Sequence, residues 1–270
     1  LARFVGPQPM TKTDRERRGF YGRDDEIENI VSKLSSAEIR HLILLGESGC
    51  GKTSLLLAGV IPELEAQAIY HPIYLRFSDH PVQALRTALR AELERAIPDM
   101  ASSPIEALRA TWVQVQKPII LFIDQFEEFH INQISEADYQ AIQELVWAVA
   151  GRRAYIDAKI VFCLRYDFLH MMDVFYDENY VNKDFANGEV RIRIEPFEAK
   201  IAEEVVCKSL MRSDGGGLEW SASLIRRVLD DLPMERIIHG QRKQIVLPSE
   251  LQIVFQMVHA KRIVSADAYP

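Results

Sequence analysis

The amino-acid sequence predicts an α/β fold, in which a five-stranded parallel sheet is followed by a small C-terminal helical domain. Strand-like apolar runs alternate with helical patterns as far as Pro196, which is typical of parallel sheets. Residues 46–53 match the pattern GxxxxGK[ST] between an apolar run and a helical segment, the context that this motif requires. From Glu198 onward the strand patterns stop and helical patterns follow.

Five short segments have the composition of strands. Three are almost entirely apolar, as expected for strands that are buried on both faces, and two alternate between apolar and polar residues. The predicted strands are residues 41–45, 71–77, 119–123, 159–164 and 190–194. By analogy with folds that carry the same motif and the same extra unit, we expect the strand order 5-1-4-3-2, with residues 159–164 in the middle.

Helical periodicity, capping residues and prolines mark the helices. Asp24 and Asp25 precede apolar residues at helical spacing, and Ser135 is a candidate N-cap. A helix that begins at Lys52 is expected to end before Pro62. The other predicted helices cover residues 82–97, 105–115, 135–150, 198–212, 221–232 and 248–263.

The change of pattern at Pro196 is the predicted domain boundary. We expect residues 1–195 to form one domain, with an N-terminal segment at residues 1–40 whose first half, residues 1–21, is irregular. Residues 196–270 are expected to form a separate helical domain.

The composition limits the functional classes. The 270 residues are 48% hydrophobic, enough for one large or two small domains, and the net charge of −7 argues against an overall basic surface for nucleic acid. The three cysteines show no disulfide pattern, which favours reduced thiols in the cytoplasm. No apolar stretch approaches the roughly 18 residues of a membrane span. Because the chain begins at Leu1 with neither Met nor a signal-like segment, and stops just after a helix-like segment, we expect a piece cut from a longer protein.

The glycine-rich segment predicts a phosphate-binding loop of a P-loop NTPase. Its glycines allow backbone N–H groups to curl around phosphates, and the following helix adds its positive N-terminal end. Lys52 is expected to reach the β- and γ-phosphates, and Thr53 to bind Mg²⁺ through its hydroxyl. Cys50 is expected to contribute only its backbone. The candidate nucleotide-binding residues here are Gly46, Glu47, Ser48, Gly49, Cys50, Gly51, Lys52, Thr53 and Ser54.

Two further candidates follow buried strands. Asp124 ends the apolar run at residues 119–123 and is expected to bind Mg²⁺ directly or through water. Arg165 ends the strand that the expected order places in the middle of the sheet, where it can contact the γ-phosphate. A glutamate that activates water commonly follows such an aspartate, but here Gln125 takes that place, and Glu127 and Glu128 come later.

The base of the nucleotide is predicted to be adenine. Guanine-specific NTPases use an [NT]KxD loop that follows the strand-end aspartate. Residues 11–14 have these letters but precede the phosphate loop, and residues 182–184 lack the spacing. We interpret both as coincidences.

Together these motifs resemble STAND-class P-loop ATPases, specifically the novel STAND (nSTAND1-like) branch found in bacterial multidomain proteins. The resemblance covers nearly the whole chain. Residues 4–9 are similar to an FxGPxPF segment, with Met10 in place of its last phenylalanine, and residues 20–27 to an FFGRxxEI segment. Residues 124–128 are similar to the family's DQFEE and residues 164–169 to its LRxDFL, and these two motifs are specific.

The resemblance implies roles for further residues. Tyr21, Gly22 and Arg23 would lie against adenine, and Pro248 would close over the nucleotide, although a glycine that relatives carry nearby is absent. Related ATPases place acidic residues three and four positions after the metal aspartate, so the resemblance makes Glu127 the first candidate for positioning water and Glu128 the second. The candidate catalytic residues are therefore Lys52, Glu127, Glu128 and Arg165.

The resemblance also implies a signalling switch. STAND proteins hold ADP in a closed monomer, and a trigger sensed by another domain allows ATP to replace it. The opened modules then assemble and activate an attached effector, in many bacterial relatives for antiphage defence. Hydrolysis would be slow and would reset the switch, and the helical domain would act as a lid.

Two other functions remain open from the residues alone. The chain could be a continuously cycling motor ATPase of the AAA type, acting on nucleic acid or protein. It could also be a scaffold that keeps ATP as a structural ligand without hydrolysis, although Lys52, Thr53, Asp124 and the two glutamates argue against this.

Overall fold

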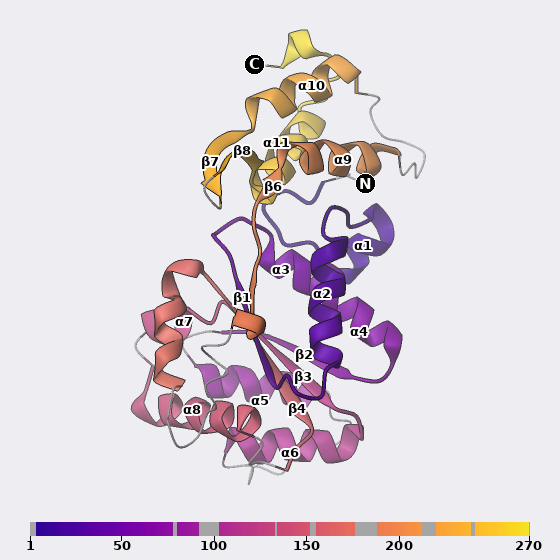
Figure 1. The fold of residues 1–270 in the computed structure, drawn as a ribbon. Helices are drawn as coiled ribbons and strands as arrows, with labels where there is room; N and C mark the ends of the chain where they lie inside the picture. The colour runs from indigo at the N-terminus through magenta and orange to yellow at the C-terminus, as the bar shows by residue number, and fades with distance from the viewer. Residues whose placement is uncertain are drawn as a thin grey trace. The chain divides into compact units, whose positions relative to one another are not determined.

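The computed structural model divides the chain into two compact units (Figure 1). It describes residues 4–77, 80–91, 103–132, 134–151, 155–175, 188–211, 220–238 and 241–269. The first unit, here called the composite unit, consists of residues 1–28, 48–62 and 194–270. The second, the sheet unit, consists of residues 29–47 and 63–193. The predicted division of the chain at residues 195 and 196 stays a prediction.

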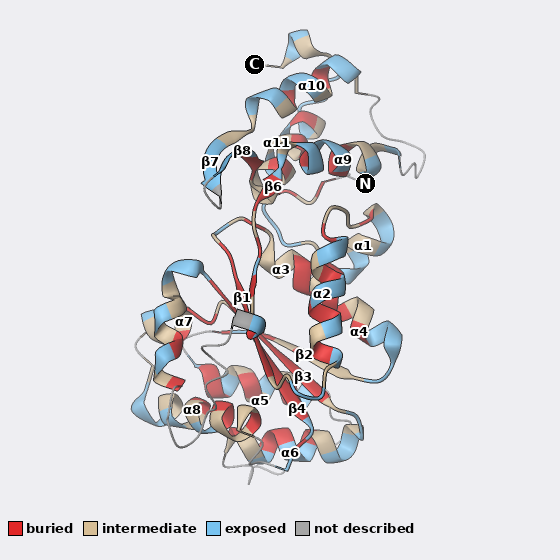
Figure 2. Ribbon diagram, viewed as in Figure 1, coloured by how far each residue is buried: buried red, intermediate tan, exposed pale blue. Residues whose placement is uncertain are grey.

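A five-stranded parallel sheet forms the centre of the sheet unit. Its strands are β1 (His41–Leu45), β2 (His71–Arg76), β3 (Ile119–Asp124), β4 (Ala158–Leu164) and β5 (Arg191–Arg193). The spatial order β2-β3-β4-β1-β5 confirms the predicted order 5-1-4-3-2. Every residue of β1, β3 and β4 is buried, which explains their almost uninterrupted apolar sequences (Figure 2).

Helices cover the sheet within this unit. They are α5 (Pro81–Ala91), α6 (Pro104–Val115), α7 (Glu128–Ile131) and α8 (Glu136–Ala150), with 3₁₀ turns at Tyr166–Phe175 and Gly188–Val190. Ser103 and Ser135 cap α6 and α8, each accepting a hydrogen bond from a backbone N–H of the first turn. Helices α5, α6 and α8 pack against one another and against β2 and β4. Residues 92–97 of the predicted helix 82–97, and residues 182–184, lie outside the described residues.

The helix after the phosphate loop does not stop at Pro62, so this prediction was wrong. It runs as α3 (Lys52–Ser54), a π-helical segment at Leu55–Val60 and α4 (Ile61–Gln67). Proline has no N–H, so where the helix changes from π to α bonding at Pro62, a carbonyl of the preceding turn lacks its usual donor. Here Nη1 of Arg15 donates to the Ala58 oxygen at 3.3 Å and to the Gly59 oxygen at 3.2 Å. The arginine therefore supplies a donor to two carbonyls of the turn that precedes Pro62.

The composite unit contains helices and a second sheet. Its helices are α1 (Lys12–Arg18), α9 (Ala199–Met211), α10 (Ala222–Asp231) and α11 (Pro248–Ala260), and α2 (Asp24–Ser35) begins in it. The antiparallel sheet has the order β6-β8-β7, formed by β6 (Phe197–Glu198), β7 (Met234–Ile238) and β8 (Gln241–Val246). A 3₁₀ turn at Ala266–Ala268 lies near the C-terminal end.

The three helices predicted beyond Glu198 are present, but the prediction that strands stop there was wrong. The strands β7 and β8 are rich in charged residues, and in β8 only Ile245 and Val246 are buried, so no apolar run marked them. Helix α1 also lies in a segment that we predicted to be irregular. Its seven residues bury none of their side chains, so they show no apolar periodicity.

Aromatic stacking joins the N-terminal segment to the core of the composite unit. The ring of Phe4 lies 5.0 Å from that of Phe255 and 6.0 Å from that of Trp220, between centroids. Buried residues of α9, α10 and α11 complete this core. Among the residues described, no helix is both long enough and apolar enough to cross a membrane.

Candidate functional site

The phosphate loop depends on two glycines with left-handed backbone geometry. Gly49 has φ +81° and Gly51 has φ +92°, and Gly51 precedes the first residue of α3. A Cβ atom on Gly49 would lie 2.4 Å from Oγ of Ser249, so a side chain at this position is disfavoured both by this contact and by the backbone angle. At the start of the loop, the N–H of Gly46 donates to the Leu164 carbonyl at the end of β4. Such glycines let successive N–H groups turn toward an anion.

The polar residues of the loop differ in their surroundings. Lys52 and Thr53 are half-buried in the first turn of α3, where the motif expects them, and Nζ of Lys52 lies 4.0 Å from Sγ of Cys50. Cys50 itself is fully buried. Oγ of Ser54 accepts a hydrogen bond from the Met10 N–H at 3.0 Å, so this hydroxyl binds the N-terminal segment.

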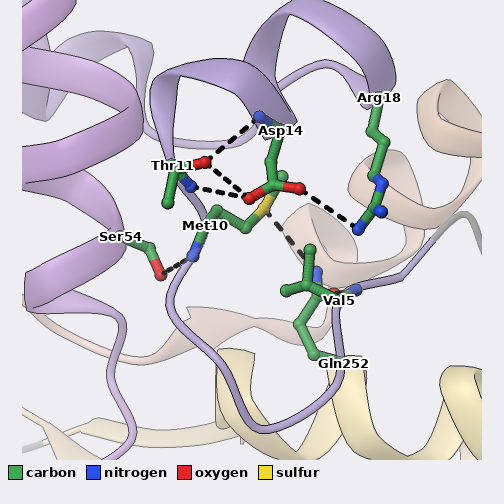
Figure 3. A network of polar contacts seen from close by, with 7 residues as sticks. All are labelled: Val5, Met10, Thr11, Asp14, Arg18, Ser54 and Gln252. Atoms are coloured by element: carbon green, nitrogen blue, oxygen red, sulfur yellow. Dashed lines mark hydrogen bonds and ion pairs between the residues drawn. The ribbon is translucent and has the colours of Figure 1, made fainter.

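The N-terminal segment also contacts α11 (Figure 3). The Val5 N–H donates to Oε1 of Gln252 at 3.0 Å, and Nε2 of the same amide lies 4.0 Å from Sδ of Met10. Thr11 and Asp14 form a reciprocal capping box that begins α1, and Arg18 pairs with Asp14 at 3.3 Å. The letters T-K-T-D at residues 11–14 therefore form a helix cap. The spacing of Thr11 and Asp14 is the signal that would have predicted α1.

Arg23 is a buried arginine that bonds to several parts of the composite unit. Its Nη2 donates to the Cys50 carbonyl in the phosphate loop at 2.9 Å and to the Glu195 carbonyl at 2.7 Å. Its Nη1 pairs with Glu26 at 2.5 Å, and its guanidinium group lies 4.4 Å above the centre of the Phe197 ring. The guanidinium group is therefore committed to protein partners, which the resemblance to adenine-binding segments did not indicate.

Tyr21 and Gly22 lie next to Arg23 and to the core formed by the C-terminal helices. Gly22 has φ +80°, and a Cβ atom on it would lie 2.6 Å from Cγ2 of Val205 in α9. Tyr21 is half-buried and packs against the same core. The structure thus brings Tyr21 and Gly22 together with the core to which α9 contributes.

The first turn of α11 contacts the phosphate loop within the composite unit. The Ser249 N–H donates to the Gly49 carbonyl at 3.2 Å. Pro248 lies close to Gly51, with side-chain carbons 3.6 and 3.7 Å from the position that a Cβ on Gly51 would take. Sequence reasoning selected Pro248 but missed Ser249, because a serine after a helix-initiating proline carries no distinctive pattern.

In the sheet unit, Asp124 is buried at the end of β3 and is only 1% exposed. Its Oδ2 accepts a hydrogen bond from the Tyr74 hydroxyl at 2.9 Å, and its Oδ1 accepts one from the Gln125 N–H at 2.9 Å. Burial, and next the charge of Asp124, raise the pKa of Tyr74, so this hydroxyl keeps its proton and acts as the donor. Sequence reasoning missed Tyr74, because the pairing of β2 with β3 is what places it near Asp124.

Two phenylalanines hold the segment after Asp124 in the core. Phe126 and Phe129 are buried with ring centroids 5.2 Å apart, and Phe126 lies 4.8 Å from Phe162 of β4. Gln125 adopts φ +55° at the turn that leads from β3 into this segment. The aromatic anchors fix the backbone on both sides of Glu127.

The two glutamates of this segment have different environments. Glu127 is 8% exposed, and its Oε2 accepts a hydrogen bond from the Arg165 N–H at 3.3 Å, at the carboxyl end of β4. Glu128 is half-buried and begins α7. The structure therefore brings Glu127, and not Glu128, into contact with the backbone at the carboxyl end of β4.

The guanidinium group of Arg165 is exposed. Its Nη2 pairs with Asp167 at 2.8 Å, and its carbon lies 5.4 Å from the centre of the Phe168 ring. Both partners lie within three residues of Arg165, so the arrangement is local, and the guanidinium group is open to solvent. Arg165 follows β4, which lies between β3 and β1 as predicted.

The residues fit a nucleotide and Mg²⁺ by their chemistry. The phosphate loop offers backbone N–H groups and Lys52 to phosphate, and Thr53 and Asp124 are oxygen donors suited to Mg²⁺. Among the described residues, no three His, Cys, Asp or Glu side chains form a group that could hold a metal ion. A Mg²⁺ ion bound chiefly by phosphate and water oxygens needs only one or two protein ligands.

Solved structures share the fold at low sequence identity. The chain is similar to the Walker-type ATPase PABY2304 of Pyrococcus abyssi, with 13% identity and a TM-score of 0.59, covering 96% of this chain and 71% of that one. It is also similar to the Aeropyrum pernix ORC1 protein, whose structure was solved in complex with DNA, with 13% identity and a TM-score of 0.59. This similarity covers 91% of this chain and 62% of that one, so the chain spans less than two thirds of ORC1.

A third similar structure is the Aeropyrum pernix ORC2 protein in its ADPNP–ADP complexes. The identity is 12% and the TM-score 0.55, covering 78% of this chain and 56% of that one. No curated protein matches the sequence. The family described as Novel STAND NTPase 1 matches the chain over residues 4–266.

Proposed function

Because the chain belongs to the Novel STAND NTPase 1 family, we propose that it is the nucleotide-dependent switch module of a longer signalling protein. In this proposal it binds ADP in a resting state, exchanges it for ATP, opens and self-associates, and thereby activates an attached effector. Slow hydrolysis of ATP returns it to rest. The biological role that we propose is bacterial antiphage defence, as in many relatives.

One observation carries this proposal. The first turn of α11 bonds directly to the phosphate loop, through the Ser249 N–H and the Gly49 carbonyl, and Pro248 packs near Gly51. A loop that binds phosphate changes its contacts when the phosphates change. The C-terminal helices can therefore respond to the bound nucleotide without a separate relay element.

The proposed roles of the site residues follow from their chemistry. Lys52 and the loop N–H groups bind the β- and γ-phosphates, Tyr21, Gly22 and Arg23 lie on the adenine side, and Pro248 closes over the nucleotide. Thr53 and Asp124 are the proposed protein ligands of Mg²⁺, which when bound neutralises charge on the phosphate oxygens. Arg165 contacts the γ-phosphate once it leaves Asp167.

Glu127 is the proposed residue that positions and deprotonates the attacking water. Its carboxylate is held at the carboxyl end of β4 by the Arg165 N–H, and its backbone is fixed by Phe126 and Phe129 in the core. Burial and a defined orientation are what a general base requires. Glu128 is the alternative, and its position at the start of α7 gives it no comparable contact with β4.

The competing function is an AAA-type motor that acts on nucleic acid or protein. The similarity to the Aeropyrum ORC1 protein, solved with DNA, is the observation that favours it. A continuously cycling motor would turn over ATP without a trigger and would be stimulated by its substrate. The net charge of −7 argues against a broad DNA-binding surface.

The nucleotide content of the purified protein distinguishes these functions. The protein is denatured and the released nucleotides are separated and quantified, with Lys52→Ala as the control that should carry none. Stoichiometric ADP supports the switch. An empty site that turns over added ATP, faster when DNA is added, supports the motor. A wild-type protein that neither carries nor binds adenine nucleotide contradicts both functions.

A further inference from the structure

The packing of β2 shows on which face of the sheet Tyr74 lies. Ile73 and Leu75 point into the core shared with α5, α6 and α8, so Tyr74 between them points to the opposite face. Strands β2 and β3 are parallel, with Tyr74 opposite Phe122 and Arg76 opposite Asp124. A tyrosine is long enough to extend along the strand toward its carboxyl end, where Asp124 stands.

The contact with Asp124 has the geometry of an ordinary hydrogen bond. The Tyr74 hydroxyl oxygen lies 2.9 Å from Oδ2, and the Gln125 N–H lies 2.9 Å from Oδ1, so each carboxylate oxygen receives a donor. A carboxylate that is 1% exposed needs such donors, because burial without them is costly. Two donors on opposite oxygens also fix the plane of the carboxylate group.

We propose that Tyr74 is a positioning residue for Mg²⁺, which holds the Asp124 carboxylate in the orientation that the metal requires. The inference rests on the proposed function, because it takes Asp124 as the residue that binds Mg²⁺. In this role the hydroxyl acts only through the Asp124 carboxylate and does not itself contact metal or nucleotide. Partners that orient metal ligands in this way commonly change metal affinity about 10- to 100-fold when they are removed.

The test replaces Tyr74 by Phe, which keeps the ring and removes only the hydroxyl. Binding of a fluorescent ATP analogue is measured in EDTA and then across a series of Mg²⁺ concentrations. We expect the affinity in EDTA to equal that of the wild type, and the half-saturating Mg²⁺ concentration to rise about 10-fold. Tyr139→Phe, which removes a hydroxyl from the same unit, is the matched control and should leave the Mg²⁺ curve unchanged.

Two further variants separate this inference from the proposed function. If Asp124→Asn leaves the Mg²⁺ curve unchanged, the assignment of Asp124 to the metal fails, and the role of Tyr74 fails with it. If Asp124→Asn changes the curve while Tyr74→Phe does not, only the role of Tyr74 is overturned. An equal loss of affinity for Tyr74→Phe in EDTA and in Mg²⁺ would mean a structural role and would also overturn it.

A double variant guards against a general loss of stability. In the Asp124→Asn background the hydroxyl no longer orients a metal ligand, so adding Tyr74→Phe should not raise the Mg²⁺ requirement further. An additive increase in the double variant contradicts the proposal. Thermal melting of each variant without nucleotide shows whether the fold is retained.

Discussion

The guanidinium group of Arg23 donates a hydrogen bond to the Cys50 carbonyl, with Nη2 and O 2.9 Å apart. The same nitrogen donates to the Glu195 carbonyl, directly before the segment that begins the second sheet. One buried side chain therefore connects the backbone of the phosphate loop with the start of the C-terminal segment. A change in the conformation of either backbone would disturb the bonds to the other.

Replacing Arg23 by Met is predicted to lower the free energy of unfolding by about 2–4 kcal/mol. The substitution leaves the carbonyls of Cys50 and Glu195 without this donor, and each buried carbonyl that loses its partner costs about 1–3 kcal/mol. Urea unfolding measures the change. Arg17→Met is the control, because Arg17 is exposed on α1 and should change stability by less than about 0.5 kcal/mol. Equal stability of the two variants would contradict the role of Arg23.

The dependence of the Arg15 hydrogen bonds on Pro62 can be measured as a coupling energy between the two residues. Arg15→Met is predicted to destabilise the protein by about 1–2 kcal/mol, because it removes the donor to the Ala58 and Gly59 carbonyls. In a Pro62→Ala background, position 62 regains an N–H, and the same substitution should cost about 1 kcal/mol less. Unfolding of the four proteins of this cycle gives the coupling, and purely additive effects would refute this explanation of Pro62.

Turnover should distinguish Glu127 from Glu128. Glu127→Gln is predicted to reduce the rate of ATP hydrolysis roughly 10²-fold while nucleotide binding is kept, since a positioned general base contributes at least this factor. Glu128→Gln removes the same charge one residue later and serves as the matched control, with a rate close to that of the wild type. Single-turnover hydrolysis measures both. If Glu128→Gln is the slower variant, the roles of the two glutamates are reversed.

The stability of the protein is predicted to fall as the pH falls below about 6.5, because of His41. This residue is 4% exposed at the start of β1, and burial lowers its pKa to about 4. Between these pKa values the unfolded chain binds a proton that the folded chain does not, so unfolding is favoured as the pH decreases. Near pH 5 the predicted loss from this residue is about 2 kcal/mol relative to neutral pH.

Burial, and next the charge of His170, lower the pKa of His130 to about 4, so His130 adds to the same effect. Urea unfolding of the wild type and of His41→Gln at about pH 7 and about pH 5 tests the contribution of His41. The variant should lose less stability on acidification than the wild type does. The same loss in both proteins would show that His41 does not cause the acid sensitivity.

Much of the sheet and of the phosphate loop could be predicted from the sequence, for local reasons. Strands β1, β3 and β4 are buried on both faces, so their apolar runs stand out, and the loop motif requires glycine at positions with left-handed geometry. The strands β7 and β8 gave no such signal, because charged and polar residues interrupt their apolar residues and most of their described side chains are exposed. Helix α1 showed a capping box and no apolar face.

The sequence by itself determined the class of fold, the phosphate loop and the candidate residues Lys52 and Asp124, because each of these follows from patterns within a few neighbouring residues. The order of the strands was predicted by analogy with folds that carry the same motif, and Glu127 was selected by the resemblance to a known family. Only the tertiary structure decided which side chains support them: Tyr74 on Asp124, Arg23 on the Cys50 carbonyl and Ser249 on the Gly49 carbonyl. These pairs are between 27 and 200 residues apart in the chain. Such contacts are set by strand register and helix packing, which no local pattern encodes.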